Sequence, residues 1–200
     1  MKLLYSPFSP FARKVRIVAH ELGLQDRIEV VPTSTEDPAS GLSARNPLNK
    51  IPVLETEFGP LYDSPVICEY LDSLQEGGKL VPAMGPARWQ ALRWQALADG
   101  LMDAALLIRY ELTLRQEGGR SESWTERQKA KIRKSLDQME ADAAELDGPL
   151  TIGSIAAAAA LGYLDLRFAD WGWRETHPRL AAWHAVFAER PSYVTTIAQA

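Results

Sequence analysis

The chain has 200 residues, of which 46% are hydrophobic, enough to build a sizeable core in one large domain or two small ones. Its 22 basic and 26 acidic residues give a net charge of -4, so no basic field exists to attract nucleic acid or anionic lipid. Cys68 is the only cysteine, which excludes an internal disulfide and any CxxC metal or redox pair. We therefore expect a reducing, cytoplasmic setting and a small-molecule or protein partner.

No stretch of the sequence predicts export or a membrane span. The amino terminus has only a few apolar residues before Arg13 and Lys14, too few for a signal peptide. The most apolar stretch, 155–164, is followed by Asp165 and Arg167, so it is too short and too interrupted to cross a bilayer. A buried helix explains this stretch better.

The first predicted elements are a strand, a tight turn and a helix. The apolar run 3–5 reads as a strand, and Ser9 before Pro10 is typical of a helix start, because the serine oxygen caps the helix and the proline has no N–H to lose. Apolar residues at helical spacing continue this helix over 11–22, and Gly23 ends it. The hydroxyl of Ser9 would lie beside unsatisfied N–H groups that favour an anion, although simple capping explains the serine as well.

The next elements complete an α/β half over residues 1–76. Asp63 and Ser64 are both N-cap candidates before Pro65, so a further helix is expected to begin there. An order of βαβ followed by ββα requires a right-handed crossover between parallel strands and an antiparallel hairpin, hence a mixed sheet with helices against it. The segments before Asp63 are a strand over 28–31, a loop over 33–46 with a short helix near Leu42, and two hairpin strands within 46–55 and 58–62.

The second half of the chain is helical in character. A linker rich in Gly and Pro over 77–86 separates it from the first half, and we expect an all-helical domain over 87–200. The three histidines show no metal-ligand spacing, so no metal site is predicted. The predicted helices span 87–116, 122–146, 152–168 and 178–189.

Three motifs, taken in order, resemble the cytosolic glutathione transferase superfamily. The first resembles the omega-type Cys-Pro-Phe pattern, with Ser9 standing where those relatives carry cysteine, and bacterial serine-type members are closer still. The resemblance covers nearly the whole chain and implies an α/β plus all-α fold, a thioredoxin-like glutathione-binding domain followed by a helical domain. The motifs are Ser-Pro-Phe-Ala-Arg-Lys-Val-Arg from Ser9, Asn-Pro-Leu-Asn-Lys-Ile-Pro-Val-Leu from Asn46, and Asp-Ser-Pro-Val-Ile-Cys-Glu-Tyr-Leu from Asp63.

The resemblance implies that glutathione is a co-substrate and that Ser9 activates its thiol. A free thiol has a pKa of about 8.5, and lowering it by two units needs about 2.7 kcal/mol. A hydrogen bond from the Ser9 hydroxyl to the thiolate supplies about 1.5 to 3 kcal/mol, and the helix terminus about 0.3 to 1 more. Tyr5 is the reserve donor, as in tyrosine-type members of the superfamily.

The resemblance also implies how the rest of glutathione is held. The peptide bond before Pro52 would be cis, which leaves the N–H and C=O of Ile51 to pair with the cysteinyl backbone like a strand edge. Asp63 and Ser64 match the acidic-Ser pair that holds the γ-glutamyl end, since the start of a helix suits a carboxylate. Lys50 fits the glycyl carboxylate.

The sequence departs from the family pattern at two places. Omega-type relatives have a basic residue ahead of the second helix, where this chain has Glu36 and Asp37, so the glycine end of glutathione depends on Lys50 or Arg45. The central helix of the second domain usually begins with Ser or Thr followed three residues later by Asp. Here the pattern is Thr151 to Ser154, so we expect Thr151 to cap the helix mostly alone.

The resemblance implies a homodimer and an apolar site for the second substrate. Asp99 matches a residue that reaches the glutathione of the neighbouring subunit. The electrophile site is expected on the variable apolar side chains of the helical domain, with Phe11, Leu107, Tyr110 and Trp171 as candidates. We expect a small electrophile with an apolar body.

The implied function is that of a glutathione S-transferase enzyme, and three alternatives stay open. A thiol-disulfide oxidoreductase or dehydroascorbate-type reductase ordinarily needs a cysteine at position 9, which this chain lacks. A non-enzymatic binding module could use the same fold, because fold does not determine function. A glutathione-dependent isomerase or dehalogenase would share the sulfur site and differ only in the second substrate.

Overall fold

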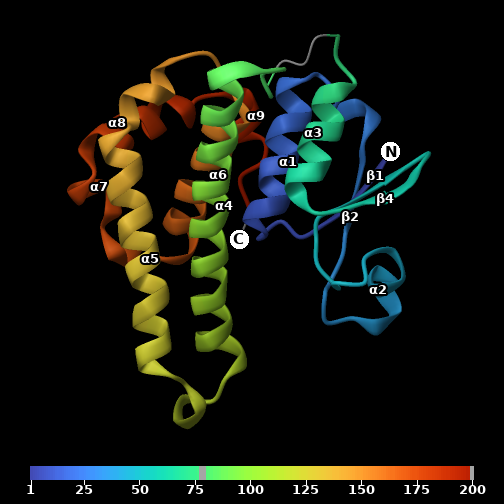
Figure 1. The fold of residues 1–200 in the computed structure, drawn as a ribbon. Coiled ribbons are helices and arrows are strands. Elements are labelled where there is room, and N and C mark those ends of the chain that lie inside the picture. Colours follow the sequence, from blue (N-terminus) through green and yellow to red (C-terminus); the bar gives the residue numbers. More distant parts are fainter. Residues whose placement is uncertain (77–79, 199–200) are drawn as a thin grey trace. The chain divides into compact units, whose positions relative to one another are not determined.

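The computed structural model of the chain describes residues 1–76 and 80–198 (Figure 1). The described chain divides into two compact units, Met1–Trp89 with Glu189–Ala200, and Gln90–Ala188. The domain boundaries expected from the sequence stay a prediction, and residues 77–79 of the expected linker lie outside the described residues. The units differ from that expectation in grouping the segment from Glu189 onward with the first half of the chain.

The first unit is built on a mixed four-stranded sheet in the order β2-β1-β3-β4, which confirms the predicted sheet type. β1 pairs parallel with β2 and antiparallel with β3, and β4 pairs antiparallel with β3. The pair of β3 and β4 is the predicted hairpin, whose strands are only two residues apart along the chain. The strands are β1 Lys2–Tyr5, β2 Glu29–Pro32, β3 Val53–Thr56 and β4 Gly59–Leu61.

Both faces of this sheet are covered, because side chains that alternate along β1 and β3 are apolar on both sides. Leu4 and Val53, which face each other in the register, pack with Leu42 of the short helix α2. Their neighbours Leu3 and Leu54 are also buried, on the face toward the helix pair α1 and α3 (Figure 1). The helices of this unit are α1 Pro10–Glu21, α2 Leu42–Arg45, α3 Ser64–Ser73 and α9 Pro191–Val194.

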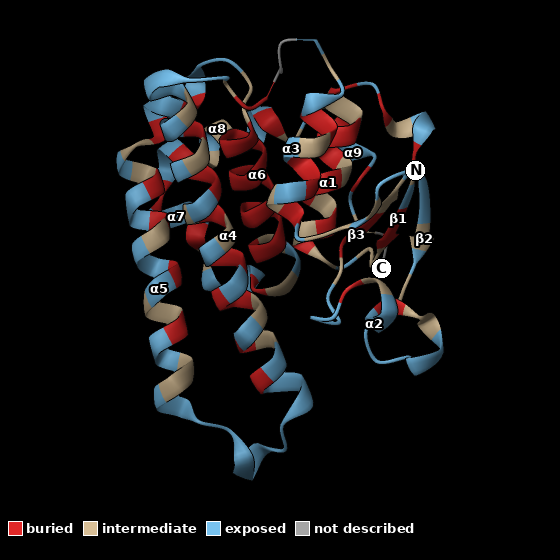
Figure 2. Cartoon of the chain, turned by 45° about the vertical axis from the view of Figure 1, so that its right-hand side comes forward, coloured by how far each residue is buried: buried red, intermediate tan, exposed pale blue. Residues whose placement is uncertain are grey.

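The second unit is helical throughout its described residues, as predicted. Helix α6 is buried at every position from Ile152 to Leu164 (Figure 2). A Cβ added to Gly153 would lie 2.6 Å from Trp94 Cβ and 2.7 Å from Ala91 O of α4, so the two helices approach very closely there. The helices are α4 Gly85–Leu114, which starts in the first unit, α5 Glu122–Ala141, α6 Ile152–Arg167, α7 Trp173–Thr176 and α8 Pro178–Phe187.

Short 3-10 turns connect several of these elements. They span Gln25–Arg27, Pro38–Ser40, Glu117–Gly119, Ala143–Asp147 and Ala169–Trp171.

The start of α6 corrects one expectation. Thr151 Oγ1 accepts a hydrogen bond from the Ser154 N–H at 3.4 Å, and Ser154 Oγ accepts one from the Thr151 N–H at 3.0 Å. The prediction that Thr151 caps this helix mostly alone is therefore wrong. The serine hydroxyl reaches back across the first turn and fills the reciprocal place that a longer acidic side chain usually takes.

Within residues 1–76 and 80–198, no single helix is long and apolar enough to span a membrane. The segments Ile152–Arg167 and Ala169–Thr176 reach the required length only as a pair, and that pair is bent by 99°.

Candidate functional site

The strand register brings three of the predicted motifs to one end of the sheet. Leu4 near the end of β1 faces Val53 at the start of β3, and Leu61 at the end of β4 faces Leu54. Because these pairs are antiparallel, the segments after β1, before β3 and after β4 all leave the sheet at the same end. Those segments hold Ser9, the Ile51-Pro52 pair and the Asp63-Ser64 pair.

Ser9 is the N-cap of α1, as predicted, and is half-buried. Its Oγ accepts a hydrogen bond from the Ala12 N–H at 3.2 Å, and its own N–H donates to Ser6 O at 3.1 Å. A hydroxyl has one proton to donate and two lone pairs to accept with. Capping therefore uses only an acceptor position, and the Ser9 proton stays available to an anion placed at the amino end of the helix.

Tyr5 contacts a later part of the same helix. The guanidinium of Arg16 lies 5.3 Å from the centre of the Tyr5 ring. Arg16 is seven residues beyond Ser9, which corresponds to about 10 Å along a helix axis. The structure thus associates the Tyr5 ring with the middle of α1, while Ser9 lies at its amino end.

The segment before β3 presents an open peptide edge. The Ile51-Pro52 bond is cis, as predicted. Pro52 is buried, and the Ile51 side chain packs against the cluster around Leu42. Among the described residues, neither the N–H nor the C=O of Ile51 forms a backbone hydrogen bond. This edge can accept an extended peptide in the way that an unpaired strand would.

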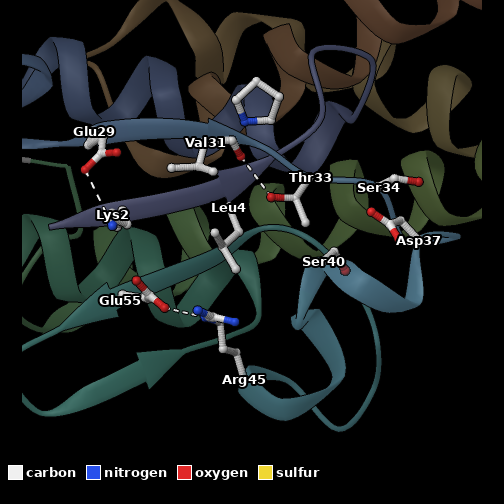
Figure 3. Close-up of a pocket in the computed structure, with 11 residues that line it drawn as sticks. Lys2, Leu4, Glu29, Val31, Thr33, Ser34, Asp37, Ser40, Arg45 and Glu55 are labelled. Carbon is white, nitrogen blue, oxygen red and sulfur yellow. Dashed lines mark hydrogen bonds and ion pairs between the residues drawn. The ribbon is translucent and has the colours of Figure 1, made fainter.

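Lys50 and Arg45, the two cations considered for the glycine carboxylate, differ in their surroundings. Arg45 Nη1 donates to Gly41 O at 2.9 Å, and its Nε is paired with the Glu55 carboxylate (Figure 3). Lys50 is exposed and forms no ion pair within the part of the chain that the structure describes. Lys50 is therefore the cation of this pair that remains open to an incoming carboxylate.

The amino end of α3 has no side-chain cap. Asp63 occupies the N-cap position, but its exposed carboxylate makes no capping hydrogen bond. Ser64, the first residue of the helix, is 2% exposed, and the first helical bond runs from the Ile67 N–H to Asp63 O at 3.0 Å. Ordinary helix capping would also explain Asp63 and Ser64 in the sequence, but the Asp63 side chain makes no capping hydrogen bond in the structure. The helix start keeps N–H groups that suit an external carboxylate.

The remaining predicted residues lie on helices and turns of the two units. Phe11 is half-buried on α1, and Asp99 is half-buried on α4. Leu107 and Tyr110 are exposed three residues apart, so they share a face of α4. Trp171 is 38% exposed and its ring lies 4.3 Å from that of Phe168. Phe11 belongs to the first unit and the other three electrophile-site residues to the second, so their grouping in one site stays a prediction.

A separate hollow of about 310 Å³ lies in the first unit (Figure 3). Two ion pairs line it, Lys2 with Glu29 and Arg45 with Glu55. Arg45, the alternative cation for the glycine carboxylate, lines this hollow, whereas none of the other predicted glutathione-binding residues does, namely Lys50, Ile51, Pro52, Asp63 and Ser64. Across residues 1–76 and 80–198, no three His, Cys, Asp or Glu side chains form a group that could hold a metal ion.

Sequence reasoning missed the contacts that fasten the end of the chain to α1. Glu21 accepts hydrogen bonds from Nε and Nη2 of Arg190, both at 2.8 Å, and another from Ser192. Arg13, one turn after Ser9, donates to Tyr193 O at 3.3 Å and stacks 4.0 Å above the Tyr193 ring. No local signal could have revealed these contacts, because the partners are about 170 residues apart in the sequence.

Family models match both halves of the chain. The model for the glutathione S-transferase N-terminal domain matches residues 8–74, and the model for the C-terminal domain matches residues 122–185. Together they cover more than half of the chain. The chain belongs to the glutathione S-transferase family.

The chain is similar to relatives that it matches along nearly its whole length, two of them solved structures. The uncharacterized GST-like protein YibF of Escherichia coli is 34% identical over 201 aligned residues, which cover 98% of each chain. A glutathione transferase family member from Pseudomonas fluorescens Pf-5, solved with bound glutathione, is 44% identical with a TM-score of 0.95, covering 100% of this chain and 99% of its own. A glutathione S-transferase from Methylobacillus flagellatus, also with glutathione bound, is 38% identical with a TM-score of 0.90 and 98% coverage of both chains.

Proposed function

We propose that this protein is a glutathione S-transferase that binds glutathione and activates its thiol for attack on a small electrophile. One observation supports the proposal most directly. Three groups lie in segments that leave the sheet at the same end: the hydroxyl proton of Ser9, the open peptide edge of Ile51 and the uncapped start of α3. Glutathione offers the matching groups, namely a thiol, a peptide backbone and a carboxylate. Relatives solved with bound glutathione, including the Pseudomonas fluorescens protein, add support.

Each end of glutathione has a complementary partner in this proposal. The γ-glutamyl carboxylate meets Ser64 and the start of α3, and its ammonium meets the Asp63 carboxylate. The cysteinyl N–H and C=O pair with the C=O and N–H of Ile51, whose direction suits them because Pro52 follows in the cis form. The glycyl carboxylate meets Lys50, which compensates for the acidic residues after β2.

Ser9 then acts on the sulfur. Its hydroxyl donates a hydrogen bond to the thiolate, and the amino end of α1 adds a favourable field, so the thiol loses its proton to solvent near neutral pH. The thiolate sulfur forms a bond to the electrophilic carbon, and the leaving group departs with the electron pair of its own bond. Ser9 stays uncharged and forms no covalent intermediate.

The proposal also covers the site of the second substrate, the cellular environment and the oligomeric state. Phe11, Leu107, Tyr110 and Trp171 would receive the apolar body of the electrophile. A reducing, cytoplasmic environment fits a chain whose one cysteine, Cys68, is buried and has no second cysteine to pair with. The proposal includes a homodimer, as the resemblance to the family implies.

Binding and turnover test the proposal separately. Titration calorimetry with glutathione should give saturable binding that Ser64→Ala weakens, because the γ-glutamyl carboxylate loses a donor. Ser73→Ala is the matched control, since Ser73 lies at the other end of α3, where its hydroxyl donates to Tyr70 O at 2.7 Å. A panel of electrophiles, with a peroxide and a disulfide beside them, then identifies the reaction. Binding without turnover on any of these would favour a non-enzymatic binding module instead.

A further inference from the structure

Asn46 is a buried polar side chain that the proposed chemistry does not use. It is 1% exposed and follows directly after α2. Its Nδ2 donates to the carbonyl oxygen of Lys50 at 2.8 Å, and its Oδ1 accepts from the Leu48 N–H at 3.0 Å. Its own C=O accepts from the Asn49 N–H at 2.8 Å. One residue thus closes the turn that leads into the Ile51 edge.

The bond to Lys50 has a consequence for the next residue. The C=O of Lys50 and the N–H of Ile51 belong to one planar peptide group, and in the trans form they point in opposite directions. This peptide bond is not among the cis bonds of the structure. Holding the Lys50 oxygen toward Asn46 therefore turns the Ile51 N–H away from it, and that N–H has no backbone acceptor among the described residues.

We propose that Asn46 is a positioning residue for glutathione, orienting the Lys50–Ile51 peptide so that the Ile51 N–H meets the cysteinyl backbone of the ligand. This inference rests on the proposed glutathione-binding function. Burial matters here, because the Asn46 amide is shielded from water and must satisfy its hydrogen bonds within the protein, as it does with Lys50 and Leu48. A peptide held in the bound orientation loses less conformational entropy when the ligand arrives.

Only an amide satisfies both contacts of this side chain. An amide carries a donor and an acceptor on one planar group, whereas a carboxylate of the same shape carries acceptors alone. Asn46→Asp keeps the acceptor for Leu48 and replaces the donor to Lys50 with a negative oxygen that repels the carbonyl. The substitution therefore disturbs the orientation of the Ile51 peptide specifically.

The test is glutathione affinity and turnover of Asn46→Asp against the wild-type protein. We expect the Kd for glutathione from calorimetry to rise about tenfold, which corresponds to about 1.4 kcal/mol, with a parallel rise in the KM for glutathione. The kcat and the pH midpoint of the bound thiol should stay unchanged, because Ser9 and the amino end of α1, and not Asn46, act on the sulfur. A folded Asn46→Asp protein with wild-type Kd, or with lowered kcat and unchanged KM, overturns the inference.

Asn49→Gly is the matched control within the same turn. Asn49 has a φ of 51°, which glycine tolerates, and its side chain bonds Thr35 O at 2.9 Å rather than the Lys50 peptide. Asn49→Gly should keep wild-type affinity for glutathione to within about twofold. This result is expected if Asn46→Asp weakens binding through loss of the hydrogen bond to Lys50 and not through a general loosening of the turn. Equal losses of affinity in both variants overturn the positioning role.

A measurement on the wild-type protein decides the matter if Asn46→Asp does not fold. The side-chain amide signals of Asn46 in a nitrogen-15 NMR spectrum should shift when glutathione saturates the protein, because the adjoining peptide takes up a ligand. Unmoved signals at saturation overturn the inference. Absence of any glutathione binding by the wild-type protein is a separate result, which overturns the proposed function itself.

Discussion

At the residue scale, Ser9 combines two roles that are usually alternatives. Its oxygen accepts from the Ala12 N–H and caps α1, while its proton is directed at nothing else among the described residues. The two roles are compatible because an N-cap serine needs only a lone pair. A capping serine next to two other open binding groups is thus a stronger candidate for chemistry than the same serine alone.

Ser9→Ala should raise the pKa of the bound glutathione thiol by about one to two units, because it removes a hydrogen bond worth about 1.5 to 3 kcal/mol to the thiolate. Turnover should fall while most glutathione affinity remains. Thiolate absorbance of bound glutathione, followed against pH, measures the midpoint. The helix also loses its cap, at a cost of about 1 kcal/mol in stability.

Ser6→Ala is the control for this experiment, since the Ser6 hydroxyl belongs to the same turn and accepts from the Phe8 N–H at 3.3 Å. Ser9→Cys should bring some thiol-transfer activity, because a cysteine at a helix start is acidified. If Ser9→Ala leaves midpoint and turnover unchanged while Tyr5→Phe abolishes them, the donor is the tyrosine.

At the scale of elements, the alanine-rich helix α6 is buried along most of its length and approaches α4 closely at Gly153. Five consecutive alanines, 156–160, are fully buried, and Gly153 touches Trp94 and the backbone of Ala91. Small side chains let two helix axes approach more closely than larger ones do. The run that resembles a membrane segment in its composition is therefore the centre of a helical core.

Gly153→Ala should destabilise the protein by about 1 to 3 kcal/mol, since its Cβ would have to displace the rigid Ala91 backbone as well as Trp94 Cβ. Urea unfolding followed by tryptophan fluorescence measures the change. Gly118→Ala is the matched control, because a Cβ there meets no atom within 4 Å. A Gly153→Ala protein as stable as the control would mean that the two helices separate easily.

At the scale of the whole chain, residues 190–193 contact helix α1. Glu21 of α1 accepts a two-pronged hydrogen bond from Arg190 and a further bond from Ser192. These contacts close a loop of about 170 residues, so they join the terminal segment to the helix that carries Ser9. The same helix is held by Arg13 and the carbonyl of Tyr193.

The Glu21 contact predicts a pH dependence of stability. The hydrogen bond from Arg190 lowers the pKa of Glu21 below its ordinary value of 4.5, the Ser192 bond acts in the same direction, and burial opposes them. A carboxylate with a lowered pKa in the folded state contributes stability above its unfolded pKa and loses it as pH falls through the folded one. Glu21→Gln should therefore lower the unfolding free energy at neutral pH and flatten its decline below about pH 4.5.

Urea titrations at neutral and acidic pH measure this difference. Glu126→Gln is the control, since Lys129 also lowers the pKa of Glu126, but that pair is exposed on α5 and contributes little to stability. An identical acid profile for wild type and Glu21→Gln would contradict the proposed linkage.

The expected homodimer is also a property of the whole molecule. Light scattering at micromolar protein should give about 44 kDa, twice the 22.2 kDa of one chain. Asp99→Ala should weaken glutathione binding only if that side chain reaches the neighbouring subunit. A mass of one chain together with wild-type affinity in Asp99→Ala would contradict both expectations.

The sequence by itself determined the elements and the family, because the signals for both are local. Ser9-Pro10 and Thr151 mark helix starts, and alternating or helical apolar spacing marks strands and helices within a few residues. The cis bond before Pro52 was implied by the family motif that contains it. Family motifs are read in the same way, one short stretch at a time. These predictions did not depend on knowing which segments are neighbours.

Only the tertiary structure decided which groups are occupied and which are open. Arg45 and Lys50 look equivalent in sequence, yet Glu55 on a neighbouring strand engages the first and leaves the second exposed. Asn46 reads as an ordinary turn residue until burial and the Lys50 carbonyl give its amide a specific role. Hydrogen bonds and ion pairs act over a few ångströms in space, so their partners become known only when the folded chain brings distant residues together.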